Sequence, residues 1–188
     1  MRIFINPGHA LGGRPDPGAV NCEHGVTEAA INARVAENAR IVLERYGYET
    51  KVVQSHNLRG EAPGYPNVTG LANSWPADVF VSIHANAGGG RGCETYAFST
   101  NSWGHALAAT VQQALWRAVS RIDKSFPNRG VKVNPDFTVL RRTAMPAILV
   151  ETAFLDTEEA FQLLVSHAAV FGPAIASAID QFLRAHLP

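Results

Sequence analysis

Short apolar runs and longer amphipathic stretches follow one another along the chain, and each type predicts one kind of element. Six apolar or alternating runs predict strands, at Arg2–Ile5, Glu49–Val53, Asp78–Ile83, Glu94–Phe98, Phe137–Leu140 and Ala147–Val150. Apolar residues at helical spacing predict helices at Glu28–Tyr46, Thr69–Ser74, Ser102–Val119, Glu158–Val165 and Ala168–Ala185. Thr27 is expected to cap the first helix and Gly47 to end it.

The alternation of strands and helices predicts an α/β fold, a three-layer sandwich with a mostly parallel sheet between helices. The runs DVFVSI (78–83) and AILV (147–150) lack the polar alternation of half-exposed strands, so both are expected to be central strands buried on both faces. A length of 188 residues corresponds to about one domain. No linker-like stretch divides the chain, so we expect residues 1–188 to form a single domain.

Composition and charge narrow the possible functions. Hydrophobic residues make up 46% of the chain and charged residues 17%, which is typical of a globular protein and excludes a disordered one. The 16 basic residues balance the 16 acidic ones, so no net field attracts nucleic acid or anionic lipid, and no nucleic-acid partner is expected. The two cysteines, Cys22 and Cys93, permit one disulfide but do not require it.

No segment has the pattern of a membrane span or an export signal. The longest apolar runs, such as 144–150, are far shorter than the roughly 20 residues of a spanning helix, so no membrane insertion is expected. The amino terminus, MRIFINPGHALGG, lacks the apolar core of a signal peptide. We therefore expect that the chain acts in the cytosol, leaves the cell by another route, or is missing a leader.

Side chains with metal-ligand chemistry follow three of the predicted strands. His9 comes just after the first strand, His84 follows DVFVSI, and Glu151 follows AILV. Because ligands bind outside the carboxyl ends of parallel strands, we expect these side chains to converge, with Glu28 joining them from the first helical turn. Two imidazoles and one carboxylate with an open fourth position match catalytic zinc sites, and a second carboxylate nearby is the usual general base.

Each of these residues also has a simpler interpretation. A single histidine after a strand is more often a hydrogen-bonded loop residue. The remaining histidines are interpreted in that way, and they are His24, His56, His105, His167 and His186. Glu28 alone fits a first-turn carboxylate favoured by the helix dipole, and Glu151 alone would cap the next helix or pair with Arg141 or Arg142. The metal interpretation is favoured because all four candidates occupy element ends, and because a buried, charged Glu151 is costly without a cation.

Other catalytic motifs are missing from the sequence. There is no HExxH helix and no GxSxG elbow, which argues against a zincin and against a serine α/β-hydrolase. The glycine-rich run GGGRG (88–92) follows a strand but lacks the lysine and hydroxyl residue of a phosphate-binding loop. We expect it to form a flexible rim of the cleft.

Four segments of the chain form a specific combination: NPGHALGGRPDPGA (6–19), GVTEAAINARVAENARIVLERYGYE (25–49), ADVFVSIHANA (77–87) and PAILVETAFLD (146–156). In this order and spacing they resemble the zinc-dependent N-acetylmuramoyl-L-alanine amidases, the LytC-like family of bacterial cell-wall hydrolases and phage endolysins. The resemblance implies that His9, Glu28 and His84 hold one zinc ion per chain and that Glu151 is the catalytic carboxylate. It also implies a mixed six-stranded sheet between helices.

The implied reaction is hydrolysis of the amide that joins the lactyl group of N-acetylmuramic acid to the first L-alanine of the stem peptide in peptidoglycan. Residues 1–188 would be its catalytic domain. Glu151 would take a proton from a zinc-activated water and give it to the leaving amine. Asp16 is expected to support a metal ligand or to shape its loop, and Asn86 to touch the substrate. No protein partner is required by anything in the sequence.

Departures from the family leave some questions open. Family members often have Arg and Asp after the second strand, where this chain has SHNLRGEAPGYPNVTG (55–70), with Pro and Gly instead, which leaves substrate orientation and glycan preference open. Two alternatives remain: a zinc peptidase or carboxypeptidase acting on the stem peptides, and a non-catalytic wall-binding module. The implied substrate lies outside the cytoplasm, so a chain without a leader fits a phage endolysin, a spore-associated autolysin or a shortened sequence.

Overall fold

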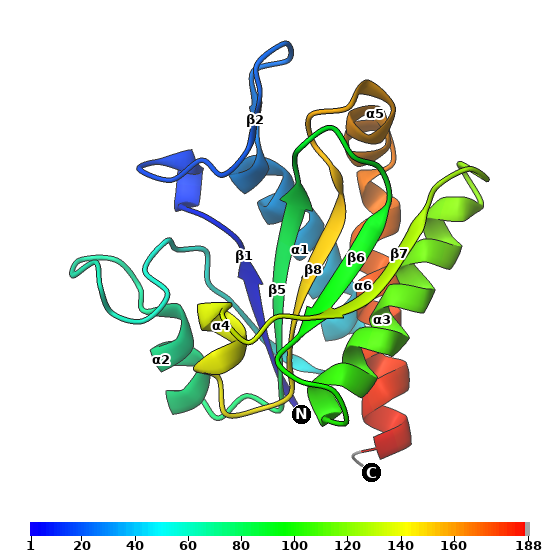
Figure 1. The fold of residues 1–188 in the computed structure, drawn as a ribbon. Coiled ribbons are helices and arrows are strands. Elements are labelled where there is room, and N and C mark those ends of the chain that lie inside the picture. The colour runs from blue at the N-terminus through cyan, green and yellow to red at the C-terminus, as the bar shows by residue number, and fades with distance from the viewer. Residues whose placement is uncertain (187–188) are drawn as a thin grey trace.

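A sheet between two layers of helices makes up the computed structural model, which describes residues 1–186 (Figure 1). The sheet strands are β1 (Arg2–Pro7), β4 (Glu49–Val52), β5 (Val79–Asn86), β6 (Cys93–Ala97), β7 (Asn128–Val133) and β8 (Ala147–Phe154). A separate small hairpin consists of β2 (Val20–Asn21) and β3 (Val26–Thr27). The helices are α1 (Glu28–Arg45), α2 (Val68–Ser74), α3 (Trp103–Ser120), α4 (Thr138–Arg141), α5 (Glu158–Ser166) and α6 (Ala168–His186), with a 3-10 turn at Leu11–Gly13.

The sheet has the order β4-β1-β5-β8-β6-β7 and is mixed. β4, β1, β5 and β8 run parallel, β6 runs antiparallel to β8, and β7 is parallel to β6. Parallel strands need crossover connections, and the long helices provide them. The expected three-layer α/β sandwich with a mostly parallel, six-stranded mixed sheet is therefore confirmed.

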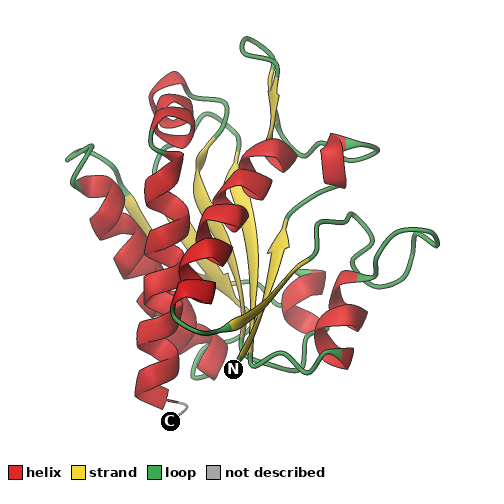
Figure 2. Cartoon of the chain, turned by 180° about the vertical axis from the view of Figure 1, so that it is seen from behind, coloured by secondary structure: helices red, strands yellow, loops and turns green. Residues whose placement is uncertain are grey.

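One face of the sheet is covered by the long helices α1, α3 and α6, which Figure 2 shows from behind. Alternate strand residues point towards these helices, among them Ile3, Val81 and Val150. α6 packs against both α1 and α3. This side contains most of the buried apolar residues and fixes the positions of the central strands.

The opposite face of the sheet is covered only by the short helices α2 and α4 (Figure 1). Phe4, Phe80 and Leu149 point to this side and pack with apolar residues of the two helices. Ser82 of β5 pairs with Leu149 of β8. The next side chains on this face are His84 and Glu151, which pair with each other and are only partly buried. The apolar pattern of this face thus ends where the candidate site begins.

Most predicted elements are present with shifts of one to a few residues, but one is wrong. Residues 137–140 were expected to form a strand, whereas Thr138–Arg141 form α4, a single helical turn that buries Val139 and Leu140. A short apolar run fits a strand and a helical turn equally well, and only tertiary packing decides between them.

The pattern also missed β7 and placed the end of β8 too early. β7 has the sequence NRGVKV and is exposed or half-buried along its length, so it lacks the apolar run of a central strand. β8 continues to Phe154, which places Glu151 inside the strand rather than at its end. Among residues 1–186, no single helix has the length and apolarity to cross a membrane, and α5 with α6 meets those criteria only as a pair bent by 74°. Cys22 and Cys93 are both free.

The close contact between α6 and α1 at Gly172 leads to a testable prediction about stability. A Cβ atom at this position would lie 2.5 Å from the carbonyl oxygen of Val35 and 2.6 Å from the amide nitrogen of Ala39. Since backbone cannot move aside as a flexible side chain can, we expect Gly172→Ala to lower the free energy of unfolding by about 1–3 kcal/mol in urea titrations. Gln181→Ala, on the exposed side of α6, is the matched control and should be nearly neutral. Equal stability of the two variants would contradict this packing.

Candidate metal centre

Three elements bring His9, Glu28 and His84 together at the carboxyl ends of the central strands. His9 lies two residues beyond the end of β1, Glu28 is the first residue of α1, and His84 lies near the end of β5. Thr27 caps α1, its side-chain oxygen accepting the N–H of Ala30, which fixes the first turn over the sheet. His9 has φ of 70°, a backbone conformation that non-glycine residues rarely adopt and that occurs often at functional sites.

The carboxylate of Glu28 lies between the two imidazoles. Its Oε2 is 2.9 Å from Nε2 of His9, and its Oε1 is 3.0 Å from Nδ1 of His84. The three side chains offer ligand atoms that all lie within 4.8 Å of one another. Imidazole nitrogens and a carboxylate oxygen are the ligands that zinc uses in catalytic sites, so this donor set fits a zinc ion.

Electrostatics at this point favour positive charge. Burial alone would raise the pKa of Glu28, but the hydrogen bonds with His84 and His9 outweigh it and hold the pKa far below its usual range. Burial likewise would lower the pKa of His9, yet its contacts with Glu28 and Asp16 raise it to about 9. The backbone N–H groups of Ala19 and Ala85 also donate to the Glu28 carboxylate. The carboxylate is therefore kept ionised and held between the two imidazoles.

Asp16 contacts the opposite side of the His9 ring. Its Oδ2 lies 2.9 Å from Nδ1 of His9, and its Oδ1 accepts the backbone N–H of Gly18 at 3.1 Å. The Asp16 contact leaves Nε2 as the ring nitrogen that faces Glu28. A carboxylate that holds the second nitrogen of a metal-ligating histidine is the usual outer partner in zinc sites.

Two glycines make room for these side chains. A Cβ atom at Gly8 would lie 2.2 Å from Cε1 of His84, and one at Gly18 would lie 2.5 Å from both Oε2 of Glu28 and Cδ2 of His9. Both contacts are shorter than real Cβ atoms make, so only glycine fits at these positions. The segments that carry them, NPGH and DPGA, are thus shaped by the two histidines and the carboxylate.

Glu151 lies next to His84 on the neighbouring strand, where the two residues form a register pair. Its Oε2 atom is buried and, among residues 1–186, has no hydrogen-bond partner. Burial raises the pKa of Glu151 to about 7. Neither Arg141 nor Arg142 forms an ion pair with it, and it does not cap α5, whose N-cap is Thr157. Both simpler interpretations of Glu151 are therefore excluded.

A cavity of about 210 Å³ opens onto this cluster. It is lined by Asn6, Gly8, His9, Asp16, His56, Leu58, His84, Phe137, Thr138, Val139, Leu149 and Glu151. His56 was assigned to the loop histidines, but its buried Nδ1 has no partner among residues 1–186 and its ring packs edge-on against Tyr65. The irregular stretch around His56 has no periodicity from which this placement could be predicted.

The other candidates lie around the cluster or away from it. Asn86 does not line the cavity: its amide donates to Oε1 of Glu94 at 2.9 Å, so its contact with substrate remains a prediction. The glycine run at 88–92 is attached to the loop after β8 by two hydrogen bonds, because the N–H groups of Gly88 and Gly89 both donate to Asp156. His24 lies in a separate exposed group with Glu23 and Glu158.

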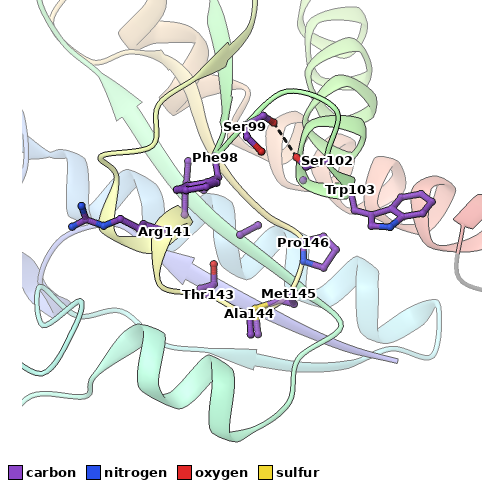
Figure 3. Close-up of a pocket in the computed structure, with 12 residues that line it drawn as sticks. Phe98, Ser99, Ser102, Trp103, Arg141, Thr143, Ala144, Met145 and Pro146 are labelled. Atoms are coloured by element: carbon purple, nitrogen blue, oxygen red, sulfur yellow. Dashed lines mark hydrogen bonds between the residues drawn. The ribbon is translucent and has the colours of Figure 1, made fainter.

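A second cavity, of about 330 Å³, lies at the other end of β8 (Figure 3). Phe98, Trp103 and Arg141 are among the residues that line it. Ser99 and Ser102 also line it, and the Ser102 hydroxyl donates to the carbonyl of Ser99. Arg141 alone among its twelve lining residues has an ionisable side chain. Glu151 lies four positions after Ala147 along β8, about 13 Å away, so this cavity is distinct from the candidate metal centre.

Comparisons with known proteins show what this chain is similar to. A family model described as N-acetylmuramoyl-L-alanine amidase matches residues 3–181. The chain is 35% identical over 162 residues to the sporulation-specific N-acetylmuramoyl-L-alanine amidase of Bacillus subtilis, covering 84% of this chain and 57% of that one. It is 33% identical over 168 residues to the endolysin of Bacillus phage SPP1, covering 86% and 58%.

Solved structures agree with the sequence comparisons. The crystal structure of an N-acetylmuramoyl-L-alanine amidase from Clostridium difficile 630 superimposes with a TM-score of 0.82 at 28% identity, covering 98% of this chain and 97% of that one. The chain spans less than two thirds of the length of the first curated relatives that it matches.

The crowding at Gly18 predicts how metal binding depends on this residue. Gly18→Ala would place a methyl group against Glu28 and His9, so we expect at least a tenfold loss of Zn²⁺ affinity in competition titrations with a chelating dye. Gly25→Ala is the matched control, because Gly25 has nearly the same φ (64° against 67°) but has no atom within 4 Å of its added Cβ. Equal Zn²⁺ affinities of the two variants would show that Gly18 does not shape a metal site.

Proposed function

Because the chain belongs to the N-acetylmuramoyl-L-alanine amidase family, we propose that residues 1–188 form one catalytic domain that hydrolyses the amide between N-acetylmuramic acid and L-alanine in peptidoglycan. One observation carries most of this proposal. His9 and His84, the two imidazoles that hold the Glu28 carboxylate between them, line a cavity together with Glu151, whose buried oxygen has no partner among residues 1–186. Metal-assisted amide hydrolysis needs a set of metal ligands and a general base.

In this proposal His9, Glu28 and His84 hold one Zn²⁺ ion. A zinc ion bound there supplies Lewis acidity, which polarises the scissile carbonyl group and lowers the pKa of a water molecule. Asp16 keeps the His9 ring in the orientation that directs Nε2 towards Glu28. The two N–H donors from Ala19 and Ala85 keep the Glu28 carboxylate from rotating.

Glu151 is the proposed proton carrier. Its unpartnered oxygen is available to a water molecule and, later, to the leaving amine nitrogen of L-alanine. With a pKa of about 7, the carboxyl group both accepts and releases a proton near neutral pH, which is the property of an efficient general acid–base. Glu151 thus takes a proton from the attacking water and returns it to the amine as the C–N bond breaks.

The walls of the cavity support the same reaction. Leu58, Val139 and Leu149 provide an apolar side that limits water around the reacting groups. His56 offers a ring nitrogen with no protein partner among residues 1–186, which suits a contact with the polar part of the substrate. We place the site of action at the cell wall, because that is where peptidoglycan is found.

Substitution of the proposed general base tests the catalytic assignment. We expect Glu151→Gln to lower kcat at least 100-fold, because the amide cannot accept the proton, while zinc content stays near one ion per chain by atomic absorption. Glu159→Gln, which changes an exposed carboxylate in α5, is the matched control and should retain wild-type activity. Full activity of Glu151→Gln on purified cell walls would contradict the assignment of Glu151 as the general base.

Digestion of purified peptidoglycan tests the reaction and the metal together. Liquid chromatography with mass spectrometry should detect free stem peptides that begin with L-alanine, together with glycan strands whose lactyl groups end in a carboxylic acid. We expect a chelator to abolish both products and added Zn²⁺ to restore them. Release of a carboxy-terminal residue would identify a peptidase instead, and binding to insoluble walls without any released peptide would identify a binding module.

A further inference from the structure

Glu94 is a buried carboxylate that lies beside the proposed general base. It belongs to β6 and forms a register pair with Glu151 on β8, so the two side chains point to the same face of the sheet. Only 2% of Glu94 is exposed. A single glutamate in a predicted strand has no distinctive pattern, so the sequence alone gives Glu94 no role.

Four side chains donate hydrogen bonds to this carboxylate. Asn86 and Tyr96 donate to Oε1, each at 2.9 Å. Arg129 and Lys132 of β7 both donate to Oε2. Burial alone would raise the pKa of Glu94, but the hydrogen bonds from Lys132, Arg129 and Tyr96 outweigh it and hold the pKa below its usual range.

The charges of this group do not cancel. Two cations share one carboxylate, so the group carries one unit of excess positive charge. Glu94 is the buried member, whereas the side chains of Arg129 and Lys132 are 36% and 38% exposed. A ligand approaching from solvent therefore meets the cations before it meets the carboxylate.

Arg129 is held in a fixed orientation with most of its donors unused. Its Nε donates to Glu94, and its guanidinium carbon lies 5.0 Å from the centre of the Phe154 ring. Within residues 1–186, the two terminal nitrogens of Arg129 have no hydrogen-bond partner. A planar guanidinium whose terminal nitrogens form a fork matches the two oxygens of a carboxylate.

Irregularities in two strands make this arrangement possible. β8 has an extra residue between the pairs His84–Glu151 and Asn86–Phe154, which interrupts the regular alternation of its side chains between the two faces. β7 has a similar irregularity opposite Glu94, at Gly130, where φ is 82°.

We infer that Arg129 and Lys132, anchored on Glu94, form a subsite that binds a carboxylate of the stem peptide beyond the scissile amide. This inference rests on the proposed function and adds to it a preference for acidic peptides. Neighbouring strands lie about 4.8 Å apart, so β7 lies on the order of 10 Å from β8 and Glu151. An extended peptide of about three residues covers that distance, which places the recognised carboxylate within the first residues after L-alanine.

Two muramoyl tripeptides that differ only in their carboxyl groups test the subsite. One carries free carboxylates on its second and third residues, and the other carries carboxamides at the same positions. We expect the zinc-loaded wild type to have a KM about tenfold lower for the acid than for the amide, the effect of one charge-assisted contact. Arg129→Gln should abolish this preference, and Arg129→Lys should restore part of it, because the charge returns without the fork.

Arg117→Gln, which removes an exposed arginine from α3, is the matched control and should keep the wild-type preference. A calorimetric titration with the free acidic tripeptide, which has no amide to cleave at this site, measures binding independently of catalysis, and Arg129→Gln should weaken it about tenfold. Thermal unfolding of each variant checks that it is folded.

The outcomes separate this inference from the proposed function. Cleavage of both substrates with equal KM, or a preference that survives Arg129→Gln, would overturn the subsite and leave the amidase function in place. Failure of the wild type to cleave either substrate would overturn the proposed function. In that case the calorimetric titration tests the subsite by itself. If Arg129→Gln binds the tripeptide as tightly as the wild type does, the subsite is overturned as well.

Discussion

The carboxylate of Glu28 ties three separate parts of the chain to one point. It lies between the imidazoles of His9 and His84 and accepts N–H groups from Ala19 and Ala85. A carboxylate at this depth is tolerated only with such partners, because removing an ion from water costs several kcal/mol. The start of α1, the loop after β1 and the end of β5 are thereby held in one arrangement, next to the cavity that Glu151 lines.

Position along the sequence was enough to predict that four candidate residues lie close together. His9, His84 and Glu151 each follow an apolar run, and Glu28 follows a helix cap, so the topology of a parallel sheet brings them to one end. The apolar runs also predicted the central strands, because these are buried on both faces and leave little room for polar residues. Local pattern and global fold agree at these positions, which is why simple rules succeeded there.

The features that were not predicted depend on register and on packing between distant segments. Glu94 lies beside Glu151 because of the register in which β6 pairs with β8. The position of Arg129 depends on the irregular pairing of β7 with β6 opposite Glu94. α4 is a helical turn because Val139 and Leu140 pack against the sheet, although the same residues suit a strand. His56 lies in a stretch without periodicity. Such placements follow from contacts across the fold, and no window of sequence contains them.

The order of strands in the sheet has a consequence for how the molecule comes into being. β5 and β6 are joined by a short link, yet β8 lies between them and arrives much later in the chain, where Asp156 binds the link through Gly88 and Gly89. Contacts between segments so far apart in sequence form slowly, and an incomplete sheet leaves a gap at its centre. A nascent chain that stops short of β8 has neither a continuous sheet nor Glu151. Synthesis must therefore proceed at least through β8 before His9, Glu28, His84 and Glu151 can come together.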